Sequence, residues 1–267
     1  MEVEAFRAKA KAWLAENASK YPADPTDMRA RGLRVALWDA GLLGVTLDPA
    51  YGGQGLSNDH QKAFNEEARA AGVAIPSDSV TVGICAPTLL DFANEEQIGR
   101  HVPAMIKGEE VWTQLLSEPG AGSDLAGLQT KAVLDGEEWV ITGQKVWTSG
   151  AMQSDYALCI ARSNPDVPKH AGLSMFIVPL RDHAGVTIRP LRQMNGEAHF
   201  NEVFLDEVRV PPRTSSVPRT RAGRRSPPCS RTSASRSARA PVRAAAAVRA
   251  GPARTPTGSS RWRAPEG

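Results

Sequence analysis

The spacing of apolar residues divides the chain into a helical first part and a strand-rich second part. In residues 3–16 apolar side chains recur every three or four positions, which is the period of an amphipathic helix. The same period continues in residues 32–40, and a glycine follows as a stop signal. Residues 59–71 are polar and alanine-rich, whereas residues 79–92 are apolar with an internal glycine and proline, which predicts a buried, interrupted helix. We therefore expect a helical domain over residues 1–110.

From residue 111 the pattern changes to short apolar segments that turn residues separate. These segments lie at residues 130–134, 138–142, 156–161, 173–178, 186–188 and 203–205. Short strands at this spacing favour an antiparallel sandwich or barrel. The predicted fold class is therefore α+β and multidomain, with an N-terminal all-α domain followed by an antiparallel β-barrel or β-sandwich domain at residues 111–212.

The composition changes abruptly after residue 212. Residues 213–267 contain 13 arginines and a single acid, Glu266, and they lack Leu, Ile, Met, Phe and Tyr. The preceding residues carry 19 basic and 28 acidic side chains, so the net charge of +3 averages an acidic body and a basic tail. Such a tail cannot bury enough apolar surface to offset ~1–2 kcal/mol of backbone ordering entropy per residue. We expect a disordered Arg/Ala/Pro-rich segment.

Two origins could account for this tail. We interpret it as out-of-frame translation of a GC-rich gene, because shifted GC-rich codons encode Arg, Ala, Pro, Ser and Gly. The alternative is a genuine basic tail that binds nucleic acid. That alternative is disfavoured because the tail has no lysine and Trp262 is its only aromatic residue. We expect no nucleic-acid partner.

Several other classes of protein are disfavoured by the sequence. No run of about 18 apolar residues is present, so no membrane-spanning helix is expected. The first residues lack the apolar core of a secretory signal. Cys85, Cys159 and Cys229 lie far apart without ligand spacing, so we expect no metal site and a reducing, cytoplasmic location.

A glycine-rich loop is the most informative stretch of the chain. An apolar run ends at Leu116, and Ser-Glu-Pro-Gly-Ala-Gly-Ser-Asp follows at residues 117–124. Glycine lets backbone N–H groups approach a ligand, and consecutive N–H groups can cradle an anion or a carbonyl. No Gly-Lys-Ser/Thr follows, which argues against a phosphate loop. An ordinary glycine-rich turn between two strands is the alternative.

The loop closely resembles the flavin-binding segment of the acyl-CoA dehydrogenases, Ser/Thr-Glu-Pro-x-x-Gly-Ser-Asp. Gln-Lys-Val-Trp-Thr-Ser-Gly at residues 144–150 resembles the second flavin segment of that family. Further similar stretches lie at residues 47–55, 94–103 and 200–211. The resemblance covers about residues 1–212 and implies a helical domain followed by a β-domain. In the family a second helical domain follows, which residues 213–267 do not resemble.

The resemblance implies FAD as cofactor and α,β-dehydrogenation of an acyl-CoA thioester. A base removes a proton from Cα while a hydride leaves Cβ for flavin N5. The electron acceptor would be electron-transfer flavoprotein, and the intact family forms homo- or hetero-oligomers. The family's catalytic glutamate lies in the second helical domain, so we assign no catalytic base here and expect a truncated, inactive chain. Alternatives are a flavin monooxygenase or nitroalkane oxidase on the same scaffold, and a non-catalytic remnant or subunit.

The resemblance also assigns site residues. The cofactor-binding positions are Gln114, Leu115, Leu116, Ser117, Gly122, Ser123, Trp147, Thr148 and Ser149. The hydroxyl of Ser117 replaces a threonine that bonds a flavin carbonyl, and that of Ser149 replaces a threonine that donates to flavin N5. Trp147 would pack against the flavin. The simpler roles are a turn cap for Ser117 and a buried strand tryptophan for Trp147.

The same loop supplies candidates for the substrate. Ser123 and Ser163 match positions that contact the CoA portion in the family. Glu118 is an acid beside the glycine-rich loop, but the family's base lies outside this motif. We therefore interpret Glu118 as a carboxylate that shapes the loop.

Overall fold

The computed structural model describes residues 1–21, 30–73, 80–211 and 215–216. The chain divides into two compact units, Met1–Ser226 and Pro227–Gly267, and the second lies wholly outside the described residues. The predicted disordered tail also lies outside them, except for the short strand Ser215–Ser216. All of the described helices and strands belong to the first unit.

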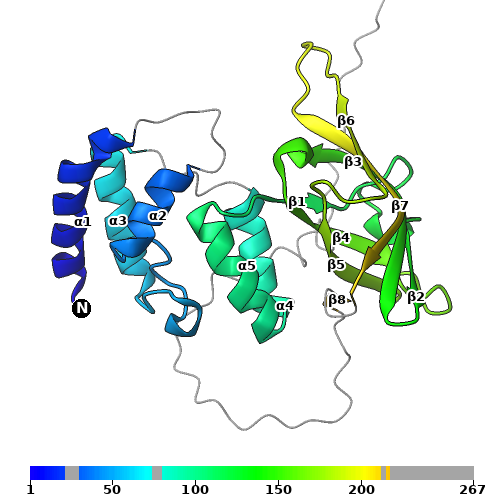
Figure 1. Ribbon diagram of the computed structural model, residues 1–267, viewed down its shortest axis with the longest axis horizontal. Coiled ribbons are helices and arrows are strands. Elements are labelled where there is room, and N and C mark those ends of the chain that lie inside the picture. The colour runs from blue at the N-terminus through cyan, green and yellow to red at the C-terminus, as the bar shows by residue number, and fades with distance from the viewer. Residues whose placement is uncertain (22–29, 74–79, 212–214, 217–267) are drawn as a thin grey trace, which may run out of the picture. The chain divides into compact units, whose positions relative to one another are not determined.

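Five α-helices occupy the described N-terminal part (Figure 1). They are α1 (Val3–Asn17), α2 (Arg31–Asp39), α3 (Asn58–Ala70), α4 (Ala86–Phe92) and α5 (Glu95–Lys107). The predicted apolar stripe of α1 is confirmed, because Phe6, Ala10 and Leu14 are buried. They share one core with residues of α2 and α3, such as Leu37 and Phe64.

The apolar segment predicted at residues 79–92 is interrupted as predicted, but it is only partly buried, since Leu90 and Phe92 are 42% and 48% exposed. A π-helical turn, η3 (Val80–Cys85), leads directly into α4. Pro87 lies in the first turn of α4, where the fixed φ of proline suits a helix. Single-turn π segments occur often near functional sites.

The following helix, α5, has a complete capping box that the apolar pattern alone did not identify. Asn94 Oδ1 accepts from the N–H of Gln97 at 2.8 Å, and the Gln97 side chain accepts from the N–H of Asn94 at 3.1 Å. The helix ends at Gly108, whose φ of 72° is left-handed, as is usual at a helix C-terminus.

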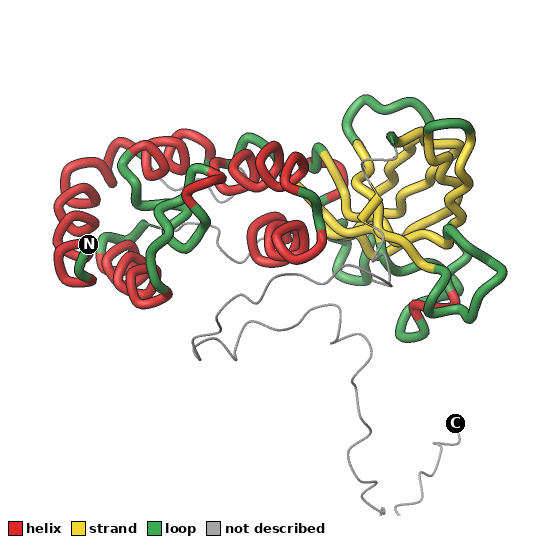
Figure 2. Tube along the Cα trace, turned by 90° about the horizontal axis from the view of Figure 1, so that it is seen from below, coloured by secondary structure: helices red, strands yellow, loops and turns green. Residues whose placement is uncertain are grey.

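The second part is one curled sheet. Its strands are β1 (Trp112–Leu115), β2 (Lys131–Asp135), β3 (Glu138–Ser149), β4 (Tyr156–Arg162), β5 (Leu173–Pro179), β6 (Val186–Leu191), β7 (Phe200–Val210) and β8 (Ser215–Ser216). Their order is β6-β7-β3-β2-β4-β5-β8, and β1 pairs with β4. Figure 2 shows the strands curving around a common interior. Apolar side chains such as Ile141, Phe176 and Val203 fill it.

The predicted fold class is confirmed, with one correction to the strand directions. Most neighbouring strands are antiparallel, but β1 runs parallel to β4, and β2 meets β4 in a parallel pair at Lys131 and Arg162. The reason is the connection, because β2 and β3 form a hairpin and the chain then crosses back to β4. Residues of β1 thereby acquire partners from distant parts of the chain.

The free edge of β1 is closed by the π-helical turn. The hydroxyl of Thr81 accepts from the N–H of Trp112 at 2.8 Å and donates to its carbonyl at 3.0 Å. Cys85 Sγ lies 3.5 Å from the carbonyl oxygen of Thr113. Because unpaired backbone groups at a sheet edge are costly when buried, these side chains stabilise the first half of that edge, at Trp112 and Thr113.

Candidate functional site

Two strand ends meet beside the glycine-rich loop. The N–H of Val146 in β3 donates to the carbonyl of Ser117, just beyond β1, at 2.9 Å. The hydroxyl of Thr113 donates to the carbonyl of Ser149 at 2.8 Å. A hollow of about 120 Å³ lies here, lined by Val80, Thr113, Gln114, Leu116, Ser117, Val146, Trp147 and Ser149. The structure thus brings Ser117, Trp147 and Ser149 together.

Trp147 faces outward because the strand is irregular there. Side chains two residues apart on a regular strand share a face, yet Lys145 is fully buried while Trp147 is 62% exposed. The register with β7 shifts between Lys145 and Thr148, and Trp147 has a left-handed φ of 59°. Its ring stands edge-on to Phe200 at 6.1 Å. The exposure rules out a buried strand tryptophan at this position.

The other positions predicted to bind flavin are buried to different degrees. The side chain of Leu115 is fully buried in the β-domain core, so only its backbone can meet a ligand. Gln114 and Leu116 are half-buried and line the hollow. Thr148 is 2% exposed, and its hydroxyl has no hydrogen-bond partner among the described residues.

The glycine-rich loop is a tight turn rather than an open cradle at its start. Glu118 and Ala121 exchange backbone bonds, N–H to O, at 2.8 and 3.1 Å. These two N–H groups are therefore not available to a ligand. Gly122 and Ser123 are exposed further along the loop, and they are not among the residues that line the hollow.

Glu118 makes a buried ion pair with a lysine to which the sequence pattern assigns no role. The carboxylate lies 2.9 Å from Lys145 Nζ and accepts from the N–H groups of Gln129 at 2.6 Å and Thr130 at 2.9 Å. Burial raises the pKa of Glu118, but the hydrogen bonds from these partners outweigh it and lower the pKa below its usual range. An ionised carboxylate with three hydrogen-bond donors fits the loop-shaping interpretation. In the sequence Lys145 lies beyond the predicted strand 138–142, within the segment 144–150 that resembles a family motif, and nothing there indicates that it is buried.

The two predicted CoA positions lie on neighbouring loops. Ser163 follows β4, and its hydroxyl pairs with that of Ser174 at 2.5 Å. The loop after Ser163 is tied to the glycine-rich loop by Lys169, whose ammonium lies 2.8 Å from a carboxylate oxygen of Asp124. Within the described part of the chain no hydrogen bond joins Ser123 to Ser163, so their common role stays a prediction.

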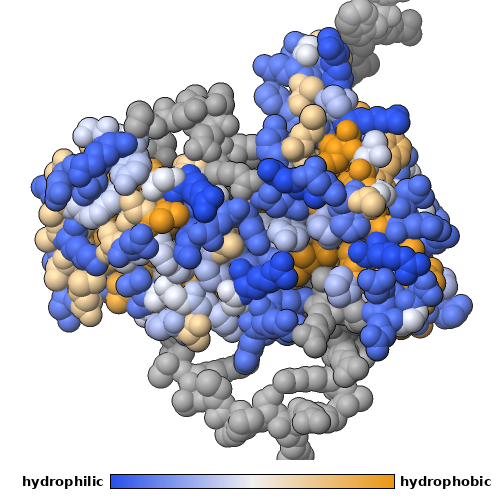
Figure 3. All heavy atoms as spheres, in the orientation of Figure 1, coloured by the Kyte–Doolittle hydropathy of each residue, from blue (hydrophilic) through white to orange (hydrophobic). Residues whose placement is uncertain are grey.

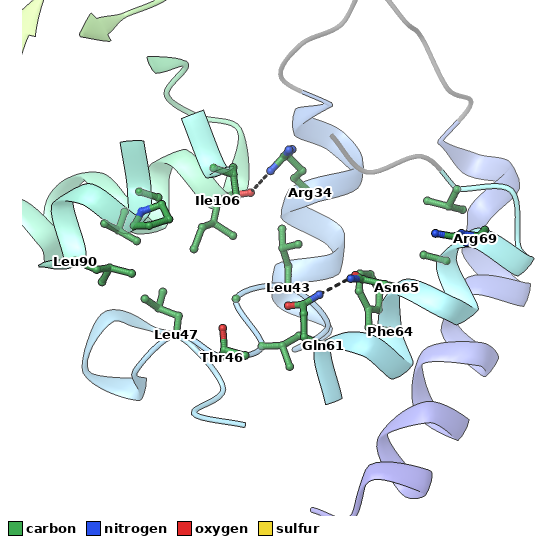
Figure 4. A pocket seen from close by; sticks show the side chains of 18 of the residues that line it. Arg34, Leu43, Thr46, Leu47, Gln61, Phe64, Asn65, Arg69, Leu90 and Ile106 are labelled. Carbon is green, nitrogen blue, oxygen red and sulfur yellow. Dashed lines mark hydrogen bonds between the residues drawn. The ribbon is translucent and has the colours of Figure 1, made fainter. Parts of the chain in front are cut away.

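A larger hollow of about 820 Å³ lies among the helices (Figure 4). Its wall is mainly apolar, with Leu43, Leu47 and Phe64, and the guanidinium of Arg34 donates to the carbonyl of Ile106 at 2.9 Å. It contains none of the predicted site residues. On the face shown in Figure 3, apolar residues also gather over the strands.

Two other kinds of feature are absent from the described residues. None of the helices placed in the structure has the length and apolar character to cross a bilayer. Within the same residues, no cluster of three or more His, Cys, Asp or Glu side chains could hold a metal ion.

Comparison with known proteins identifies the family of the chain. Residues 1–109 match the acyl-CoA dehydrogenase N-terminal domain, and residues 113–208 match the acyl-CoA dehydrogenase middle domain. Acyl-CoA dehydrogenase FadE34 of Mycobacterium tuberculosis is 49% identical over 67% of this chain and 25% of its own length. Acyl-CoA dehydrogenase IpdE1 of the same species is 42% identical over 78% of this chain and 57% of its own length.

Solved structures show the same relationship. The steroid ACAD Tcur3481-Tcur3483, as a G363A variant, superposes with a TM-score of 0.64 at 35% identity over 80% of this chain and 57% of that chain. The ChsE4-ChsE5 complex of Mycobacterium tuberculosis gives 0.61 at 32% identity, over 80% and 55%. The chain belongs to the acyl-CoA dehydrogenase family, a family of flavoprotein oxidoreductases. It spans between a quarter and about three fifths of the length of FadE34 and IpdE1.

Proposed function

We propose that this chain is the N-terminal and middle part of an FAD-dependent acyl-CoA dehydrogenase. The supporting observation is that Ser117 and Ser149 line one hollow beside the exposed ring of Trp147. Neither serine hydroxyl has a hydrogen-bond partner among the described residues. Two unused hydroxyls beside a flat apolar ring suit a planar ligand with polar edges.

The residues present fit a flavin. The hydroxyl of Ser117 would bond a carbonyl of the ring, and that of Ser149 would donate to N5. Trp147 would pack against the ring, and the backbone near Leu116 would reach its pyrimidine edge. When bound, FAD supplies the hydride acceptor, while the protein supplies orientation and polarisation. Gly122 and Ser123 complete the proposed cofactor segment.

The proposed substrate is an acyl-CoA thioester, with Ser123 and Ser163 toward its CoA portion. Relatives include a cyclohexane-1-carbonyl-CoA dehydrogenase of Syntrophus aciditrophicus at 34% identity and a long-chain specific acyl-CoA dehydrogenase of Sus scrofa at 32% identity. Cyclohexane-1-carbonyl-CoA and long-chain acyl-CoA thioesters therefore both belong in an assay, and we propose a role in lipid metabolism. We also propose a cytoplasmic location, on the dispersed cysteines.

The proposed electron acceptor is an electron-transfer flavoprotein. A similar solved chain, at 25% identity and a TM-score of 0.60, comes from a structure named for the electron transferring flavoprotein of Acidaminococcus fermentans. The complete protein would be a homo- or hetero-oligomer. Two solved relatives are named with two protein designations each, which suits a hetero-oligomer.

No residue of the matched range 1–208 is assigned as the catalytic base, and we propose that the 267-residue chain does not turn over acyl-CoA. In this proposal residues 213–267 are out-of-frame translation. Sequencing codons 205–220 should reveal a single-base shift that restores a frame encoding amphipathic helices. Stop codons or low-complexity sequence in both other frames would contradict this.

The flavin site is tested by titrating the purified chain with FAD and following quenching of flavin fluorescence. We expect weak binding that Ser117→Ala and Ser149→Ala each weaken about 3–10-fold, since a hydrogen bond contributes roughly 0.5–1.5 kcal/mol. Ser19→Ala, at an exposed helical position, is the matched control and should bind as the unaltered chain does. If the unaltered chain leaves flavin fluorescence unchanged, or if the three variants bind alike, the proposed site is wrong.

A further inference from the structure

The ammonium of Lys145 is fully buried and fully used. It donates to the carbonyl of Leu116 at 3.1 Å, to the carboxylate of Glu118 at 2.9 Å and to the carbonyl of Ile160 at 2.8 Å. A lysine has three N–H donors, so this arrangement leaves none for a ligand. A buried charge is costly unless it is paired and hydrogen-bonded, and here both conditions are met.

The partners of this pair come from separate strands. Leu116 follows β1, Ile160 lies in β4, and Lys145 itself lies in β3. Glu118 extends the connection through the N–H groups of Gln129 and Thr130, which precede β2. One ion pair therefore ties four strands together at a single point.

That point brackets Ser117 on both sides. Lys145 holds the backbone of Leu116 before it and the side chain of Glu118 after it. Among the described residues, the backbone of Ser117 is held by the N–H of Val146, which donates to its carbonyl. The bulge after Lys145 turns the side chain of Trp147 outward. One short segment of β3 therefore holds the loop through the buried side chain of Lys145 and lines the hollow with the exposed side chain of Trp147.

We propose that Lys145 and Glu118 are positioning residues for the flavin segment. They fix the backbone at Leu116 and Ser117 against β3. This keeps Ser117 at the distance from Ser149 that one flat ligand requires. Neither Lys145 nor Glu118 touches that ligand. The inference rests on the proposed function for the identity of the ligand. The holding role itself is a property of the protein without flavin.

The structure offers a matched pair of double variants. Lys145→Met with Glu118→Gln removes both buried charges, so neither is left unpaired, but it removes the ties to Leu116 and Ile160. Lys169→Met with Asp124→Asn makes the same chemical change at the exposed pair on the same loop. The two double variants therefore differ in whether the pair that they remove is buried. They differ also in whether that pair holds the backbone carbonyls of Leu116 and Ile160.

The first measurement is amide hydrogen exchange by mass spectrometry on the full chain without flavin. In the Lys145/Glu118 double variant, exchange in peptides covering residues 116–130 should rise at least 10-fold, while peptides from α1, α3 and β5 stay within 2-fold. The Lys169/Asp124 double variant should stay within 3-fold throughout. Unchanged exchange at residues 116–130, or an equal rise across the whole β-domain, overturns the proposal.

The second measurement is FAD affinity, which the first double variant should lower at least 10-fold and the second less than 3-fold. A folded Lys145/Glu118 double variant that binds FAD as tightly as the unaltered chain overturns the positioning role. If the unaltered chain binds no FAD while exchange rises as expected, the proposed function fails and the holding role stands.

Discussion

The glycine-rich loop carries two lysine–carboxylate pairs that have nearly equal separations and very different burial. The Lys145–Glu118 pair has a separation of 2.9 Å and side chains that are 0% and 6% exposed. The Lys169–Asp124 pair has a separation of 2.8 Å and side chains that are 53% and 64% exposed. Exposed pairs contribute about 0–1 kcal/mol, whereas breaking a buried pair costs about 3–5 kcal/mol. The distance between the charged atoms therefore does not show which of the two pairs holds the loop in place.

The largest expected difference between the pairs is in stability. Lys145→Met should lower the free energy of unfolding by about 3–5 kcal/mol, because it leaves the Glu118 carboxylate buried without its cation. Lys169→Met should lower it by about 1 kcal/mol or less. Urea denaturation followed by tryptophan fluorescence measures both. Equal losses would mean that burial does not distinguish the pairs.

Acidification should weaken the buried Lys145–Glu118 pair, and we expect a smaller change in stability than Lys145→Met causes. The pKa of Glu118 is lowered in the folded protein from an ordinary value of 4.5, so its contribution to stability is complete above that value. It is then lost as the pH falls through the lower pKa of the folded state. The stability difference between the unaltered chain and the Lys145/Glu118 double variant should be constant from about pH 6 to 8 and shrink in acid. A difference that grows in acid would contradict this direction.

Salt should produce the smallest effect, and only at the exposed pair. At 1 M salt the screening length is about 3 Å, and exposed charges are screened far more than buried ones. The stability change caused by Lys169→Met should therefore vanish in 1 M NaCl, while that caused by Lys145→Met should persist. Denaturant titrations at about 0.1 and 1 M NaCl test this, with Lys62→Met, from another exposed pair, as the control. Loss of the Lys145 effect in salt would show that water reaches the pair.

The sequence predicted elements well where apolar residues recur regularly. The helix predicted at residues 3–16 and the strands at residues 156–161 and 173–178 agree with α1, β4 and β5 to within a residue or so. The strand predicted at residues 138–142 was too short, since β3 continues to Ser149. Polar residues such as Lys145 interrupt the apolar pattern there, although this lysine is buried.

The sequence suggested candidate site residues but not how they lie relative to one another, and their roles remain predictions. Resemblance to the family identified Ser117, Trp147 and Ser149, and the structure brings them to one hollow. Their proximity depends on pairing between distant strands and on the bulge that exposes Trp147, neither of which local spacing encodes. The roles of Ser123 and Ser163 remain predictions.

The parallel placement of β1 has a consequence for how this chain folds. Trp112 pairs with Tyr156, which lies far along the chain, and its other edge is completed by Thr81, which precedes it. Contacts between such distant residues close long loops and slow folding. A ribosome that has just synthesised the glycine-rich loop has therefore not yet made the strands that shape it. The contacts that fix the loop come from β3 and β4, so a nascent chain that ends before these strands carries the complete motif without the partners that shape it.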